Sequence, residues 1–144
     1  MRIAELAERA GHAGVHVTFK IDGLRERNRW TVILDKRQDC GGSGVSKTDV
    51  ARIDQVLDFL RRHLAEQLGG HAWLDETVED ADGFADVMEE IGATGAVLLV
   101  GYRPETRWRL SGAGVQIGDY PSLDACLLDG YDRVLNAPPA TTQS

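Results

Sequence analysis

The residues with the clearest potential for chemistry form the glycine-rich stretch from Gly41 to Thr48. Its order, Gly-Gly-Ser-Gly-Val-Ser-Lys-Thr, is similar to that of phosphate-binding loops, in which a lysine and a hydroxyl hold the phosphates and Mg²⁺ of ATP or GTP. Those loops need glycine immediately before the lysine, because the backbone curls around phosphate there, and this chain has Ser46. We therefore predict a connector in which Ser46 or Thr48 caps a following helix. A nucleotide-binding protein that uses the 41–48 loop, with Lys47, is the weakest alternative.

Other patterns typical of catalytic or metal sites are incomplete. Residues 78–89 have the spacing of a calcium loop, but the first ligand position is Val78, which has no side-chain oxygen. The four histidines lack metal-ligand spacing, and Gly42-Ser43-Gly44 lacks the spacer residues of a serine-hydrolase elbow. Cys126 is predicted to face the core, where a thiol is a poor nucleophile. The sequence therefore favours a protein that is not an enzyme, with no metal or cofactor.

The elements that would position any site recur along the chain at an offset of 81 residues. Apolar helix positions followed by two glycines occur in both halves: Ile3, Leu6, Ala7, Ala10, Gly11 and Gly14, then Phe84, Val87, Met88, Ile91, Gly92 and Gly95. Glu8 recurs as Glu89, and the pair Arg29-Trp30 is matched by Arg107-Trp108. This self-similarity predicts two repeats, 1–66 and 83–136, joined by a linker at 67–82. They would form one domain, 1–136, followed by a flexible tail at 137–144.

Hydrophobic periodicity predicts the same order in each repeat, namely helix, strand, strand, helix. Helices are expected at about 2–11, 48–66 and 83–91 and after Pro121, and Trp30 is expected in the core because it alternates with Val32 and Leu34. Residues 115–117 extend a strand or form another. The uninterrupted apolar run Ala96–Val100 predicts a central strand buried on both faces. We expect an α+β fold with one four-to-five-stranded, mainly antiparallel sheet packed with helices.

Charge is distributed unevenly along the chain. Residues 1–72 hold 12 Lys/Arg against 10 Asp/Glu, a net +2, and residues 73–144 hold 4 against 13, a net −9, which together give the formal charge of −7. The acidic segment contains the predicted partner-binding residues Asp75, Glu76, Glu79, Asp80, Asp82 and Asp86. A secondary basic patch contains Arg25, Arg27, Arg29, Lys36 and Arg37. The pI of about 5.0 argues against direct nucleic-acid binding.

The chain lacks the signals of secretion and membrane insertion. No apolar run reaches the roughly 20 residues of a membrane helix, and acids interrupt the N-terminal stretch where a signal peptide would be apolar. Two cysteines, Cys40 and Cys126, are too few for a disulfide framework. These features predict a cytoplasmic protein that does not bind membranes.

The combined pattern favours a small protein-binding or inhibitory protein that uses its acidic surface against a basic partner. Immunity proteins and phage counter-defence proteins that block nucleases or DNA-binding proteins work in this way. The alternative is a structural or assembly subunit of a homo-oligomer or phage particle, which would pair through an exposed edge strand near Val115–Ile117.

Overall fold

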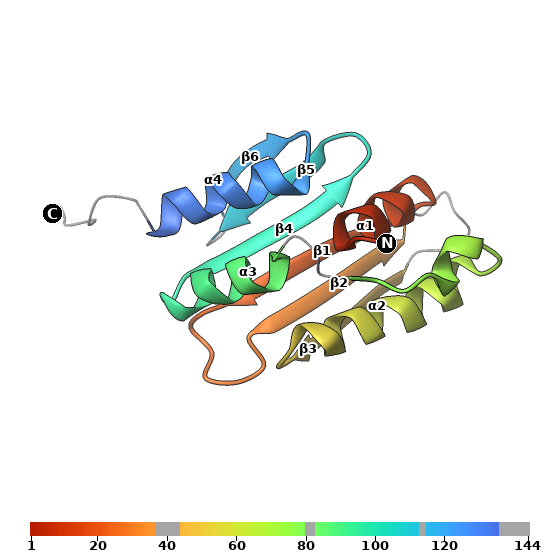
Figure 1. The fold of residues 1–144 in the computed structure, drawn as a ribbon, viewed down its shortest axis with the longest axis horizontal. Helices are drawn as coiled ribbons and strands as arrows, with labels where there is room; N and C mark the ends of the chain where they lie inside the picture. The colour runs from red at the N-terminus through yellow and green to blue at the C-terminus, as the bar shows by residue number, and fades with distance from the viewer. Residues whose placement is uncertain (37–43, 80–82, 113–114, 136–144) are drawn as a thin grey trace, which may run out of the picture.

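The structure, a computed structural model, describes residues 1–36, 44–79, 83–112 and 115–135 (Figure 1). The first half contains α1 (Ile3–His12), β1 (Val15–Asp22), β2 (Trp30–Lys36), β3 (Gly44–Val50) and α2 (Ile53–Leu68). After a short 3₁₀ helix, η2 (Ala72–Asp75), come α3 (Phe84–Ala93), β4 (Val97–Arg103), β5 (Arg107–Gly112), β6 (Val115–Tyr120) and α4 (Leu123–Leu135). The order α-β-β-β-α therefore occurs twice. The tail predicted at 137–144 lies outside the described residues.

The six strands pair antiparallel in one open sheet with the order β3-β2-β1-β4-β5-β6. The four α-helices lie on one face of this sheet, in front of it in Figure 1. In β1 the side chains of Val15, Val17, Phe19 and Ile21 alternate along the strand and are all buried. The hydrophobic core therefore lies in one layer between the sheet and the helices.

The predicted α+β class and antiparallel sheet are confirmed, but the prediction of four to five strands is wrong. The missed strand is β3, at residues expected to form a connector and the start of a helix. It pairs with β2 from Trp30↔Val50 to Lys36↔Gly44. Its central residues, Ser46, Lys47 and Thr48, are polar, so the sequence shows no apolar alternation there. Backbone pairing with β2, rather than a local preference, holds this strand in the sheet.

Helix α2 begins at Ile53 rather than near residue 48. The side chain of Gln55 accepts hydrogen bonds from the backbone N–H groups of Ala51 (3.0 Å) and Arg52 (3.1 Å). Gln55 thus satisfies backbone donors just before the helix, and the prediction that Ser46 or Thr48 caps this helix is wrong. Both of those residues lie in β3 instead.

Strand β4 is central, as the run Ala96–Val100 predicts, but it is not buried on both faces. Leu98 and Val100 are buried, whereas Val97 and Leu99 are partly exposed. The difference arises because the helices cover only one face of the sheet. An apolar run therefore need not mean burial on both sides.

The two central strands pair in a register that is symmetric about Phe19↔Val100. Those two residues are 81 positions apart, which is the offset found in the sequence. On either side Val17 pairs with Tyr102 and Ile21 pairs with Leu98. Val17 and Leu98 are also 81 positions apart, as are Ile21 and Tyr102, so the pairing is symmetric with respect to that offset.

Two tryptophans contact the opposite half in the same manner. Trp30 and Trp108 are 1% and 0% exposed, which confirms the prediction that Trp30 belongs to the core. The indole N–H of Trp108 donates to Glu8 of α1 at 2.8 Å, and that of Trp30 donates to Glu89 of α3 at 3.1 Å. Each tryptophan therefore donates a hydrogen bond to the first helix of the other half, α1 or α3.

Candidate protein-binding surface

The first part of the acidic segment runs beside the N-terminus of the chain. The backbone N–H of Glu79 donates to the carbonyl of Met1 at 2.8 Å, and the Met1 ammonium donates to the carbonyl of Thr77 at 2.9 Å. The side chains of Asp75, Glu76 and Glu79 are exposed. Backbone bonding thus holds this part of the linker and leaves its carboxylates at the surface.

Positive groups offset some of that charge. Arg9 of α1 contacts Glu76 at 3.1 Å and Glu5 at 2.8 Å, and the Met1 ammonium lies in the same region. Exposed ion pairs of this kind contribute little to stability, but they lower the net charge of the surface. Asp80 and Asp82 lie outside the described residues. The described part of the predicted acidic cluster therefore carries less net negative charge than its sequence indicates.

The acidic character continues on α3 and α4. Asp86 is exposed in the first turn of α3, and Glu89 and Glu90 are exposed further along it. Asp124 is exposed in the first turn of α4. The two helices contain one base, Arg133, which contacts Asp129 at 2.9 Å. These helices form the more acidic part of the surface.

A groove of about 490 Å³ lies between α3 and α4 and is lined by Val87, Asp124, Leu127, Leu128 and Tyr131. Leu128 is 73% exposed. Tyr131 donates its hydroxyl to Glu90 at 3.1 Å across the two helices, and this hydrogen bond raises the pKa of Tyr131. The sequence analysis did not predict this groove. The adjacent pair Leu127-Leu128 could have indicated it, because successive residues of a helix point in different directions and both leucines cannot face the core.

The predicted basic patch is partly committed to internal contacts. Arg25 contacts Asp22 and Asp49, each at 3.2 Å, and donates to the Thr31 hydroxyl at 3.2 Å. The pKa of Asp49 is lowered, chiefly by the hydrogen bond from Thr31 and also by Arg25. Arg25 therefore links the β1–β2 connection to β3, and its guanidinium is already engaged in contacts within the protein.

Three other members of that patch differ in their surroundings. Arg27 is exposed, Lys36 is partly buried at the end of β2, and the Nε of Arg29 donates to the carbonyl of Arg25 at 2.6 Å. Arg37 lies outside the described residues. The structure thus gives these basic residues no shared geometry that selects a ligand.

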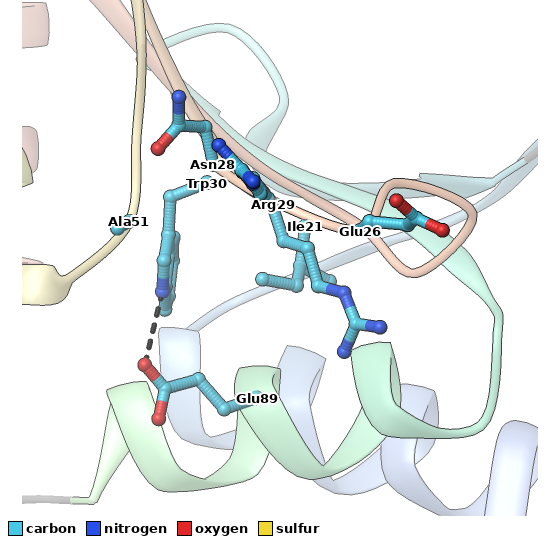
Figure 2. A pocket seen from close by; sticks show the side chains of 8 residues that line it. Ile21, Glu26, Asn28, Arg29, Trp30, Ala51 and Glu89 are labelled. Carbon is cyan, nitrogen blue, oxygen red and sulfur yellow. Dashed lines mark hydrogen bonds between the residues drawn. The ribbon is translucent and has the colours of Figure 1, made fainter.

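Figure 2 shows a pocket of about 670 Å³ that Arg29 shares with Trp30 and Glu89. The guanidinium of Arg29 extends toward α3, and Glu89 accepts the Trp30 hydrogen bond. Glu26, Arg27 and Asn28 also line the pocket. Because charges of both signs line it, the pocket does not favour an anionic or a cationic ligand.

Lys47 does not occupy the position that a phosphate-binding loop requires. In such a loop the lysine begins a helix, whereas Lys47 is an exposed residue in the middle of β3, opposite Ile33 of β2. Residues 41–43 lie outside the described part of the chain. Lys47 therefore does not lie at the start of a helix, the position that the nucleotide-binding alternative requires.

Cys126 of α4 is buried, as predicted. This burial, together with a smaller effect of the charge of Asp129, raises the pKa of its thiol to about 12. We expect its thiolate population at pH 8 to be on the order of a thousandfold below that of an ordinary thiol. Modification by a disulfide reagent should be correspondingly slow in a Cys40→Ser variant, and denaturant should restore a normal rate. Rapid modification of the folded variant would contradict this.

Comparison with protein-family models, with curated proteins and with solved structures finds no match. Within the described residues, no group of three or more His, Cys, Asp or Glu side chains is placed to hold a metal ion. None of the helices in that part of the chain is both long and apolar enough to cross a membrane. The surface itself is therefore the basis for a functional proposal.

Proposed function

We propose that this protein is a small, non-enzymatic binding protein whose acidic helix surface binds a basic protein partner. The observation that supports this most is the set of exposed carboxylates on α3, on α4 and on the segment before α3: Asp86, Glu90 and Asp124 on the helices, and Asp75 and Glu79 in the preceding segment. Opposite charge on a partner accelerates association and discriminates against acidic competitors. An inhibitor of the immunity or counter-defence type would act by covering the basic, nucleic-acid-binding surface of its target.

The test compares two variants with the same change of charge. Asp75→Asn, Glu79→Gln and Asp86→Asn together neutralise the proposed surface, whereas Glu26→Gln, Glu66→Gln and Glu105→Gln neutralise exposed acids elsewhere. Glu76 is left unchanged because Arg9 pairs with it. With the partner captured from the native host, the first variant should associate about tenfold more slowly at low salt and show a shallower salt dependence. Equal association rates for the two variants would contradict the proposal.

A homo-oligomeric or particle subunit is the second candidate, supported by the sheet edges. Among the described strands, β3 and β6 each pair with one neighbour only, and the sequence candidate Val115–Ile117 lies in β6. An open edge can accept a strand from another chain. Light scattering distinguishes the two: a mass near 15.8 kDa at high concentration supports the monomeric binder.

We also propose that the fold arose by duplication of one α-β-β-β-α unit. The symmetric register around Phe19↔Val100 and the reciprocal Trp30–Glu89 and Trp108–Glu8 bonds support it. Each unit then contains three strands rather than the two expected from the sequence.

A further inference from the structure

The groove between α3 and α4 combines an apolar lining with an acidic rim. We propose that it binds an amphipathic α-helix of a protein partner, with apolar residues seated in the groove and Lys or Arg on both flanks. The inference rests on the proposed function and identifies the binding site and the kind of segment that occupies it.

The apolar component of the site comes from four residues: Val87, Leu127, Leu128 and Tyr131. Among the described residues, Leu128 is one of three large hydrophobic side chains that are exposed, with Leu24 and Val45. Leu128 differs from Leu24 in lying beside other apolar groups in a groove of about 490 Å³. Burying such a leucine under a partner removes apolar surface from water and stabilises a complex.

The rim provides the charge that selects the occupant. Asp124 lines the groove, Glu90 accepts the hydrogen bond of Tyr131, and Asp86 lies one turn before Glu90 on α3. Arg133, the single base of the two helices, contacts Asp129. A second copy of this chain would bring the same carboxylates to the groove, so its charge opposes self-association there. A segment flanked by Lys or Arg is complementary.

Backbone hydrogen bonding favours a helical occupant over an extended one. Side chains of two helices line the groove, and it presents no strand edge with which an extended segment could pair. The buried backbone of an extended segment would therefore lose hydrogen bonds to water without replacement. A helix satisfies its own backbone groups and can insert apolar residues at i, i+3, i+4 and i+7.

The test uses labelled peptides of about 18 residues that contain only leucine and lysine. One has leucines at i, i+3, i+4 and i+7 spacing, and the other has the same composition with leucine and lysine in alternation. We expect the helical pattern to bind more tightly by fluorescence anisotropy and to shift amide resonances of α3 and α4. Leu128→Ser should weaken this binding about tenfold or more, because the main apolar contact is lost.

Leu24→Ser is the matched control, since Leu24 is 78% exposed but lies outside the groove. It should leave the affinity unchanged, whereas Asp86→Asn with Glu90→Gln and Asp124→Asn should weaken binding and flatten its salt dependence. The inference is overturned if the patterned peptide fails to bind, if both peptides bind equally, or if Leu128→Ser binds as the native protein does. Self-association that Leu128→Ser abolishes would assign the groove to a second copy and also overturn it.

These outcomes are separable from the test of the proposed function. If the groove inference is wrong, association with the native partner still depends on Asp75, Glu79 and Asp86. If that dependence is absent, the acidic-surface function itself is wrong, whatever the peptides do.

Discussion

Replacing Trp108 by alanine is expected to lower the free energy of unfolding by about 3–5 kcal/mol, the usual cost of removing a large buried aromatic side chain. Trp108 is fully buried, and its ring lies 5.4 Å from that of Tyr102, centroid to centroid. The substitution also removes the indole N–H that donates to Glu8. A domain of this size has a total stability of roughly 5–15 kcal/mol, so the variant should be close to unfolding. Urea denaturation followed by circular dichroism measures the change.

The contribution of this hydrogen bond to stability can be separated from that of ring packing by changing the acceptor, Glu8, instead of Trp108. Glu8→Gln keeps an oxygen within reach of the Trp108 N–H and should be nearly neutral. Glu8→Leu leaves that buried donor unpaired and should cost about 1–3 kcal/mol. The reciprocal arrangement predicts the same ranking for Glu89→Gln and Glu89→Leu at Trp30. Equal stability of the leucine and glutamine variants at both sites would show that these bonds do not support the core.

Alanine substitutions at two helical glycines are expected to have opposite effects. A Cβ at Gly92 of α3 would lie 2.7 Å from Cγ1 of Ile21, a buried residue of central strand β1. The resulting overpacking should destabilise Gly92→Ala by about 1–3 kcal/mol. The roughly 1 kcal/mol gained from the better helix propensity of alanine offsets part of that cost and leaves a net destabilisation of up to about 2 kcal/mol. Thermal and urea unfolding of the variant measure the net loss.

Gly130 of α4 is the matched control. A Cβ there would lie 3.4 Å from Leu98 and 3.5 Å from Leu110, which is ordinary contact distance. Gly130→Ala should therefore stabilise the protein by about 0.5–1 kcal/mol through helix propensity. If Gly92→Ala stabilises the protein as Gly130→Ala does, close packing of α3 on β1 is not the reason for glycine at position 92.

Elements with a strong local pattern were predictable from the sequence. In α1 the residues Ile3, Leu6, Ala7 and Ala10 are all buried on one face, as their spacing predicts. Trp30 and Trp108 are core residues, as expected from strand alternation around Trp30 and from its match to Trp108. Such patterns are local because each residue's direction follows from the geometry of its own helix or strand.

The candidate site was only partly predictable. The sequence identifies the acids from Asp75 to Asp86, and the structure exposes Asp75, Glu76, Glu79 and Asp86. The sequence does not indicate that Arg9 pairs with Glu76, or that Asp22 and Asp49 form ion pairs with Arg25, because these contacts depend on how the elements of the fold pack together. A charge count along the chain therefore overstates the charge available to a partner.

The sequence by itself determined the presence of the helices and the core face of β1, since each depends on periodicity within one segment. Only the tertiary structure decided that residues 44–50 form β3, because their polar side chains are placed by backbone pairing with β2. The tertiary structure also placed all four helices on one face of the sheet and set α4 beside α3. Leu128 thereby became part of a groove, since the surroundings of an exposed side chain depend on which other segments pack nearby.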